Sequence, residues 1–269
     1  MNIGISILLS LLLGLLAFLK KSLTIPALIL AVIFSIFIAN YGGLTSFIIL
    51  LVVFLGSIIT KVFNKSKKSE KRKLIQIISN VGIGTLSLII FKITRDNLYL
   101  LIYASIMAES LADTLASDIG TLSKKEPINI LTLKKGEKGL SGNISLLGLT
   151  ASLIGSVLIS LIYYIGIERD ITSFIIITLS GFLGSIIDSI LGSAIQVKYK
   201  CEKCNKITEK KEHCGKKTNY YRGIKWIDNN LVNLLSNGII FIILNYSLIW
   251  QIKENWYNIA RNMGKNYDY

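Results

Sequence analysis

The stretch TSFIIITLSGFLGSIIDSILGSAIQV, residues 172–197, decides the fold class, because Asp188 is its only ionisable residue. A helix of about 20 mainly apolar residues crosses the hydrocarbon core of a bilayer, so we interpret this stretch as a membrane span. The sequence predicts an all-α, polytopic transmembrane bundle of about eight helices, and a single integral membrane domain over residues 1–269. The other expected spans have approximate bounds 3–19, 23–40, 44–63, 74–91, 98–120, 144–166 and 229–250.

The composition excludes an ordinary soluble protein. Apolar residues make up 52% of the 269-residue chain and charged residues 17%, and the mean hydropathy is +0.57. The chain has only two prolines although its formal net charge is +14, which argues against a disordered basic tail. The basic residues must therefore be concentrated between the apolar spans.

Most of the basic residues fall in alternate loops. Of the 30 Lys and Arg residues, 24 lie at 20–21, 61–73, 124–138 and 198–225. Because cytoplasmic loops carry an excess of Lys and Arg, we predict that these loops face the cytoplasm and that both termini lie outside. If 229–250 re-enters the membrane instead of spanning it, the C-terminus moves inside. Topology and anionic headgroups account for the charge, so we expect no nucleic-acid partner.

The fifth span is unusual because it carries acids, in the sequence MAESLADTLASDIG at residues 107–120. Ionisable groups inside a span are costly and by default mark functional sites. Carboxylates combined with hydroxyls and water suit magnesium, which would relieve the repulsion among three acids. Spacings of four residues place these side chains on two adjoining helical faces, the first with Glu109, Asp113 and Ser117 and the second with Thr114 and Asp118.

Two other spans carry matching polar residues. The segment 185–189 repeats the pattern Ser-x-x-Asp-Thr/Ser of 110–114, and brings Asp188 and Ser189. Two parallel helices that each supply an acid and a hydroxyl indicate a pseudo-symmetric site. The last span begins WIDNNLVNLLSN at residue 226, which places polar residues at its cytoplasmic mouth, so we expect the site to open inward. These polar residues are Asp228, Asn229, Asn230 and Asn233.

A basic, glycine-spaced loop, LTLKKGEKGLSGNIS at residues 131–145, precedes the sixth span. Backbone N–H groups freed by glycine and the N-terminus of a helix both favour anions, so we interpret this glycine loop as a phosphate cradle. It lacks the spacing of P-loop enzymes, and a flexible basic loop without a ligand remains the alternative. The candidate phosphate-binding residues are Lys134, Lys138, Gly139, Gly142 and Ser145.

All three cysteines and the single histidine lie within fourteen residues, as Cys201, Cys204, His213 and Cys214. This set supplies four ligands of the zinc-binding type, and a cytoplasmic location disfavours disulfides. We predict a structural Zn²⁺ site in a small cytoplasmic insertion over 198–225, with a metal-free loop and a redox role as the alternatives.

The combination of intramembrane acids and a basic glycine loop indicates phosphoryl or nucleotidyl transfer to a lipid. Such chemistry needs a metal and basic groups to spread the charge of the transferred group, together with positioning of the reactants. Acids within helices also mark ion pathways, so a transporter of ions or lipids remains an alternative, and a structural membrane subunit is another.

The combined motifs resemble the integral-membrane family of transmembrane protein 19, also called domain of unknown function 92, which includes the plant phytyl-phosphate kinases. The run ADTLASDIG is the most specific of these motifs, whereas Gly142-Asn143 stands where the family often carries paired glycines. The resemblance rests on FLGSIITK (54–61), KRKLIQIISNVG (71–82), AESLADTLASDIG (108–120), the glycine loop, GFLGSIIDSILG (181–192) and WIDNNLVN (226–233).

This resemblance implies a prenyl monophosphate kinase that uses CTP or ATP and makes the prenyl diphosphate at the cytoplasmic face of the cell membrane. The implied magnesium ligands are Asp113, Asp118 and Asp188, with Glu109 as a fourth catalytic acid. A cytidylyltransferase acting on a lipid phosphate is the alternative enzyme, and the oligomeric state, including a homo-oligomer, is left open. The implied substrate and nucleotide contacts are Lys134, Lys138, Gly139, Gly142, Ser145, Thr114, Ser117, Ser189, Asn80, Asp228, Asn229, Asn230 and Asn233.

Overall fold

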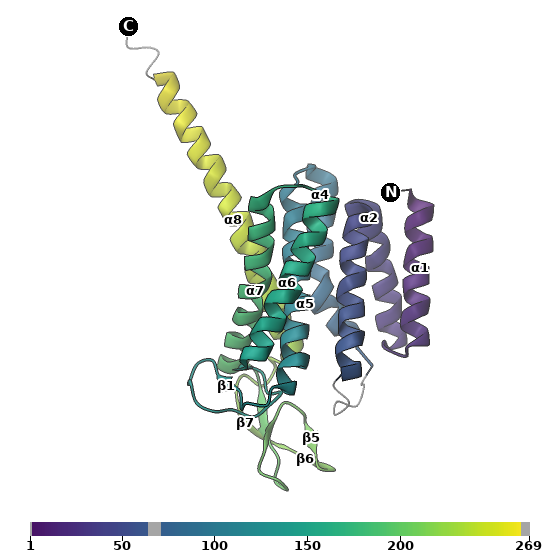
Figure 1. The fold of residues 1–269 in the computed structure, drawn as a ribbon, viewed down its shortest axis with the longest axis vertical. Helices are drawn as coiled ribbons and strands as arrows, with labels where there is room; N and C mark the ends of the chain where they lie inside the picture. The colour runs from purple at the N-terminus through teal and green to yellow at the C-terminus, as the bar shows by residue number, and fades with distance from the viewer. Residues whose placement is uncertain (1, 64–70, 265–269) are drawn as a thin grey trace.

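The computed structural model describes residues 2–63 and 71–264, which form a bundle of long helices with short strands at one end (Figure 1). The predicted loop 61–73 therefore lies partly outside the described residues. The helices are α1 (Ile3–Leu19), α2 (Ile25–Phe63), α3 (Leu74–Ile77), the π-helical turn η1 (Ile78–Gly82), α4 (Ile83–Thr94), α5 (Leu98–Ile119), the 3-10 turn η2 (Gly120–Leu122), α6 (Leu146–Gly166), α7 (Ile171–Ala194) and α8 (Asn229–Gly264).

The all-α membrane bundle is confirmed, but the count of eight spans is not. Among the described residues, five helices are long and apolar enough to cross a membrane: Ile25–Thr60, Leu74–Thr94, Leu98–Leu122, Leu146–Gly166 and Ile171–Ala194. α1 is apolar but shorter, at 17 residues. The predicted last span, 229–250, begins as expected, but α8 continues to Gly264, and its distal half extends beyond the bundle in Figure 1.

The two expected spans 23–40 and 44–63 form one element, α2, which turns back on itself at Gly43 (Figure 1). Gly43 has φ 76° and ψ −170°, a conformation outside the helical region. Thr45 Oγ1, just past the turn, donates to the Gly166 carbonyl at the end of α6. One glycine with a positive φ thus joins two antiparallel arms without a separate loop.

α5 is the central helix of the bundle. It packs against α2, α4, α6, α7 and α8, and 67% of its apolar window is buried, against 28–44% for the other candidate spans. Small residues allow this close approach, since a Cβ added to Gly181 of α7 would lie 2.7 Å from Ala108 of α5. The acids of α5 therefore lie inside the protein instead of facing lipid.

The helix Leu74–Thr94 contains a π-helical turn at Ile78–Gly82. Such turns insert one residue into a helix and are frequently found at functional sites. Here the turn presents Asn80 to α5, because the Ser110 hydroxyl donates to the Asn80 carbonyl at 2.9 Å.

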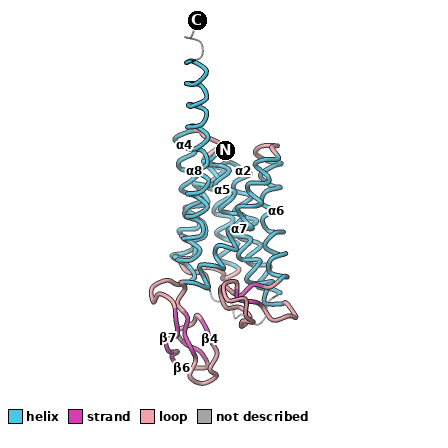
Figure 2. The backbone as a smooth tube through the Cα atoms, turned by 90° about the vertical axis from the view of Figure 1, so that its left-hand side faces the viewer, coloured by secondary structure: helices cyan, strands magenta, loops and turns pink. Residues whose placement is uncertain are grey.

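Short strands gather at the end of the bundle opposite the chain termini, in two groups (Figure 2). β1 and β2 form an antiparallel pair that closes the glycine loop. The second group is residues 198–222, called the zinc-ligand lobe after the predicted ligands that it carries: a sheet of order β4-β3-β7 and a β5-β6 hairpin. The strands are β1 (Ile128–Asn129), β2 (Asn143–Ile144), β3 (Lys198–Lys200), β4 (Ile207–Thr208), β5 (Glu212–His213), β6 (Lys216–Lys217) and β7 (Asn219–Arg222).

Candidate functional site

Two of the predicted acids lie one turn apart on α5. Glu109 is only 1% exposed, and one of its carboxylate oxygens accepts a hydrogen bond from the Ser236 hydroxyl of α8 at 2.7 Å. Asp113 follows toward the strand end, and its carboxylate accepts a longer bond of 3.4 Å from Ser117. The helix thus carries a fully enclosed acid and a second acid that reaches a pocket.

Asp188 of α7 faces the same region from the other side. It is 4% exposed, and its carboxylate interacts electrostatically with those of Asp113 and Glu109. The side-chain amide of Asn233 lies 3.2 Å from Asp188 Oδ2 and 2.6 Å from the Asn229 carbonyl, so its NH₂ group faces these two acceptors. The other end of that amide lies 3.2 Å from Asn80 Oδ1. The predicted convergence of acids from α5 and α7 with amides from α8 is therefore present.

A polar pocket of about 740 Å³, part of it open to solvent, lies between these acids and the glycine loop. Its wall combines α5, the glycine loop, the start of α6, α7 and the first residue of α8. Each of these elements was predicted from a separate motif, and the tertiary structure joins them around one space. The predicted residues that line this polar pocket are Asp113, Ser117, Lys138, Gly139, Gly142, Ser145, Asp188, Ser189 and Asn229.

The glycine loop is held in a fixed shape at Gly142. This residue has φ +85°, and its carbonyl accepts from the Ile130 N–H at 2.9 Å. An added Cβ would lie 2.7 Å from both the Cα and the N of Ser193 on α7. Glycine is required here both for the backbone conformation and for the close approach of the loop to α7.

Asn129 organises this loop, and the sequence reasoning missed it. Its buried amide donates to Gly142, Asn143 and Ser193, and its Oδ1 accepts from the backbone of residues 131 and 132. An asparagine outside the glycine motif gave no signal in the sequence, because the partners to which its amide donates are 13 to 64 residues away along the chain.

The N-terminus of α6 opens onto the polar pocket. The Ser145 hydroxyl caps the helix by accepting from the Gly148 N–H at 3.1 Å, and it also donates to the Gly120 carbonyl. Gly120 and Gly148 lie so close that a Cβ on either would be 3.3 Å from the Cα of the other. The helix therefore directs its positive end toward the space where an anion is expected.

The acids can hold magnesium only with help from other ligands. Among the described residues, the cluster of three or more His, Cys, Asp or Glu side chains with metal-binding geometry is the Cys201, Cys204, His213 and Cys214 set. Magnesium in phosphoryl-transfer sites typically takes one or two carboxylates, several waters and the substrate phosphates. Asp113 and Asp188, both lining the polar pocket, fit that pattern.

The structure places several predicted residues outside the polar pocket. Asp118, predicted as a magnesium ligand, accepts from the Thr60 hydroxyl of α2 at 2.7 Å. Asp228 caps α8 by accepting from the Leu231 N–H, and the Asn230 amide donates to the same carboxylate. Lys134 is exposed and does not line the polar pocket. Asp118, Asp228 and Asn230 thus make hydrogen bonds away from the polar pocket. Thr114 lies on another face of α5, away from that pocket.

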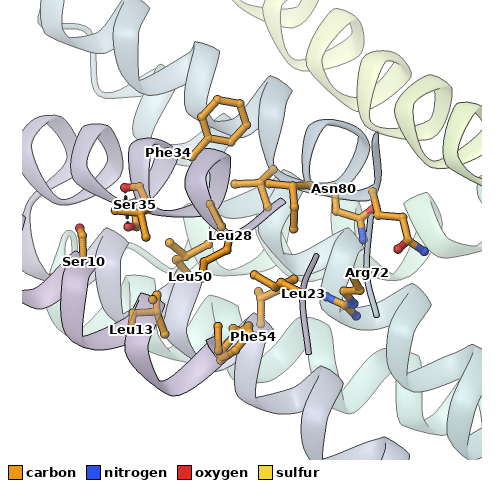
Figure 3. A pocket seen from close by; sticks show the side chains of 18 of the residues that line it. Ser10, Leu13, Leu23, Leu28, Phe34, Ser35, Leu50, Phe54, Arg72 and Asn80 are labelled. Atoms are coloured by element: carbon orange, nitrogen blue, oxygen red, sulfur yellow. Dashed lines mark hydrogen bonds between the residues drawn. The ribbon is translucent and has the colours of Figure 1, made fainter. Parts of the chain in front are cut away.

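That other face borders a second, mainly apolar pocket of about 720 Å³ (Figure 3). Side chains of α1, α2 and the helix Leu74–Thr94 line it, including Leu13, Phe34 and Leu50. Figure 3 shows Arg72 and Asn80 close together at one end of this pocket, its polar end, whereas Ser10 and Ser35 lie toward the other end. Asp113 lines the polar pocket and the next residue, Thr114, lines the apolar one. The two pockets therefore lie on different faces of the same turn of α5.

Arg72 is the second residue that the sequence reasoning passed over, since it was counted only as one loop cation. Burial lowers the pKa of Arg72, and the nearby Asp118 carboxylate acts in the opposite direction. An arginine stays protonated even so, and its planar guanidinium suits a phosphate. A fixed cation at the polar end of an apolar pocket is the arrangement that an amphiphilic phosphate needs.

The sequence profile of the family described as integral membrane protein DUF92 matches residues 8–241. The chain belongs to this family. The DUF92 match covers every candidate site residue named above, from Asn80 to Asn233, and the zinc-ligand lobe as well.

Two relatives of this DUF92 chain come from distant organisms. An uncharacterized membrane protein of Methanocaldococcus jannaschii, MJ0933, is 32% identical over 169 residues, which are 60% of this chain and 70% of the relative. Protein PGR of Arabidopsis thaliana is 34% identical over 135 residues, which are 46% of each chain. No solved structure matches.

Proposed function

We propose that this protein is a prenyl monophosphate kinase that makes a prenyl diphosphate from a nucleoside triphosphate, with CTP or ATP as donor. One observation carries the proposal: a polar pocket with two acids and a glycine loop lies one helix face away from an apolar pocket with an arginine at its polar end. The first suits a metal-bound triphosphate and the second suits a lipid phosphate. Membership of the DUF92 family agrees with an acceptor that resides in a membrane.

The apolar pocket is the proposed site of the prenyl chain. An isoprenoid tail offers only hydrocarbon surface, which gains free energy by leaving water for a wall of leucine and phenylalanine side chains. At the polar end, Arg72, Gln76 and Asn80 would bind the monophosphate. Thr114, which also lines the apolar pocket, is next in the chain to Asp113 of the polar pocket.

The polar pocket is the proposed site of the triphosphate. Asp113 and Asp188 would hold Mg²⁺, which when bound neutralises the β- and γ-phosphate oxygens. Lys138 and the N-terminus of α6 would add positive charge on the opposite wall. An oxygen of the prenyl phosphate attacks the γ-phosphorus, the bond from that phosphorus to the β–γ bridging oxygen breaks, and the nucleoside diphosphate leaves. The acceptor phosphate is already largely ionised at neutral pH, so the step requires no general base.

The direct test is product analysis with the full-length protein in detergent micelles or nanodiscs. CTP and ATP labelled at the γ-phosphate are incubated with magnesium and a panel of prenyl monophosphates. A kinase yields labelled prenyl diphosphate and unlabelled nucleoside diphosphate. Labelled pyrophosphate together with a nucleotide-linked lipid would instead show nucleotidyl transfer, and the absence of any lipid product across the panel would contradict the proposal.

The cytoplasmic orientation belongs to the proposal, because triphosphates are cytoplasmic. The structure groups the loops at 124–138 and 198–225 at the strand end of the bundle, as the alternate-loop charge pattern predicts (Figure 1). A cysteine introduced at the exposed Lys124, away from the three native cysteines, is expected to resist a membrane-impermeant thiol reagent in intact cells and, after permeabilisation, to add labelling beyond that of the unaltered protein. Arg169, in the loop between α6 and α7, is the matched position expected to react in intact cells.

Removing Arg72 is expected to weaken the acceptor site selectively. In Arg72→Ala, the KM for prenyl phosphate should rise by about tenfold or more, because a charge-assisted contact to phosphate is lost. The KM for the triphosphate should change less than about twofold, since Arg72 does not line the polar pocket. Initial-rate measurements with each substrate varied in turn separate the two effects.

The neighbouring Lys71→Ala is the matched control, because it removes one positive charge from an exposed side chain in the same segment. Equal effects of the two substitutions would show that Arg72 acts only through the general charge of the loop. Arg72→Lys keeps the charge but loses the bidentate geometry, and is expected to fall between Arg72→Ala and the unaltered protein.

A further inference from the structure

The cysteines and histidine of the zinc-ligand lobe come together in two turns. Cys201 and Cys204 flank a turn in which the Asn205 N–H donates to the Cys201 carbonyl at 2.8 Å, with Asn205 at φ +58°. His213 and Cys214 lie at the tip of the β5-β6 hairpin, where Cys214 and Gly215 both have positive φ, as a tight two-residue hairpin turn requires. Two turns with positive-φ residues therefore bring these four side chains together.

The ligand atoms have the spacing of a tetrahedral metal site. All four lie within 4.8 Å of one another, and His213 Nδ1 is 3.4 Å from Cys204 Sγ and 3.2 Å from Cys214 Sγ. Zinc with ordinary Zn–S and Zn–N bond lengths places neighbouring sulfur and nitrogen atoms about 3.6 Å apart. The three cysteines form no disulfide, so their sulfurs are available as ligands.

The same lobe holds the glycine loop by two side chains. Glu209, directly after β4, accepts from the Ser141 N–H at 2.7 Å. Lys198 of β3, which is fully buried, donates to the Ser141 carbonyl at 2.7 Å. Both backbone groups of one residue in the loop are thus bound by side chains of the lobe, and that residue lines the polar pocket.

The buried Lys198 ammonium is balanced by this arrangement. Burial and the nearby Arg222 lower the pKa of Lys198 to about 8, while Glu209 acts in the opposite direction. The attraction between this buried cation and the nearby carboxylate offsets the cost of removing them from water only when both groups are held in place.

We propose that Cys201, Cys204, His213 and Cys214 bind one structural Zn²⁺, and that this metal positions the glycine loop through Glu209. Glu209 lies between Cys204 and His213 along the chain, so the metal closes a loop of which Glu209 is part. Three thiolates and an imidazole fill the coordination sphere, which leaves no open position for catalysis. Lys198 precedes the metal-closed segment, and its strand is also anchored by the Val197 N–H donating to the Ile227 carbonyl. Loss of zinc should therefore release the Glu209 contact first.

Metal analysis tests the first half of the proposal. The full-length protein, purified in detergent without added chelator, is expected to contain about one zinc per chain. Cys204→Ser and Cys214→Ser should each lose most of it, whereas Lys203→Ser, an exposed change in the same turn, should keep it. Refilling the chelated protein with Co²⁺ should produce the charge-transfer absorption of cobalt–thiolate bonds. A protein that purifies without zinc and binds neither metal would overturn this half.

Hydrogen exchange tests the positioning half. Chelation of zinc from the unaltered protein is expected to raise amide exchange in residues 136–143 by about tenfold or more, while α5 stays protected. Glu209→Ala should produce the same exposure of the loop and yet retain zinc, which separates loss of the contact from unfolding of the lobe. Unchanged exchange in 136–143 after zinc removal would show that the lobe and the loop are independent. Neither readout depends on the identity of the substrate.

Discussion

Replacement of Asp113 or Asp188 by asparagine is expected to lower kcat by about 100-fold or more. The two carboxylates are those that line the polar pocket, and asparagine has nearly the same shape but a much weaker affinity for magnesium. The magnesium concentration that gives half-maximal rate should rise in both variants. Initial rates of diphosphate formation, with magnesium varied at saturating triphosphate, measure both effects.

Stability should move in the opposite direction in these variants. Without metal, the carboxylates of Glu109, Asp113 and Asp188 repel one another in a buried environment, and removal of one charge relieves that repulsion. The Tm of each variant without magnesium is therefore expected to equal or exceed that of the unaltered protein. A variant that loses activity and stability together would indicate misfolding instead of loss of a metal ligand.

Asp170→Asn is the matched control for these substitutions. Asp170 caps α7 at the opposite end of the bundle, where its carboxylate accepts from the Ser173 N–H at 2.7 Å. Asparagine caps helices about as well as aspartate, so activity should remain within about twofold. Retention of activity in Asp113→Asn and Asp188→Asn at the level of this control would contradict a role for both acids in the reaction.

Gly142→Ala is expected to lower kcat/KM by roughly 10- to 100-fold, because displacement of a positioning group by about 1 Å has effects of this size. Alanine is strained at φ +85°, and its Cβ would lie 2.7 Å from backbone atoms of Ser193, which cannot rotate away. The loop must therefore shift and break the bonds from Asn129 and Ile130 to the Gly142 carbonyl. The KM for the triphosphate should carry most of the loss.

Gly139→Ala separates backbone strain from displacement of the loop. Gly139 has φ +76°, close to that of Gly142, but an added Cβ would meet only Thr121 Cγ2, at an ordinary 3.5 Å. This variant is expected to lose roughly 1–2 kcal/mol of local stability and to retain most of its activity. Equal losses of kcat/KM in Gly142→Ala and Gly139→Ala would show that backbone strain, and not the close contact with α7, causes the loss of activity.

Local sequence patterns were enough to predict the helices and the grouping of their acids. The apolar stretches predicted the helices closely, as with α1 at Ile3–Leu19 and α5 at Leu98–Ile119. Four-residue spacing predicted that Glu109 and Asp113 share a face, and the repeated pattern predicted a site with Asp188, which lines the polar pocket together with Asp113. These predictions depend only on helical periodicity and on the exclusion of charge from lipid.

The predictions that were changed depended on contacts between distant segments. The count of five helices takes as one element the two expected spans 23–40 and 44–63, which are the two arms of α2 joined at Gly43. Asp118 lies in the same helix as Asp113, yet its carboxylate accepts a hydrogen bond from Thr60, 58 residues away, and does not line the polar pocket. No spacing rule within α5 contains that information.

The sequence by itself determined that this is a membrane bundle with acids inside it and a glycine loop and a cluster of cysteines and histidine outside it, because hydrophobicity, helical period and turn chemistry are properties of neighbouring residues. Only the tertiary structure decided that Arg72 ends an apolar pocket behind Thr114, that Asn129 fixes the glycine loop, and that Glu209 binds Ser141. These contacts join residues brought together by helix packing and strand pairing, and packing depends on the shape of the whole chain.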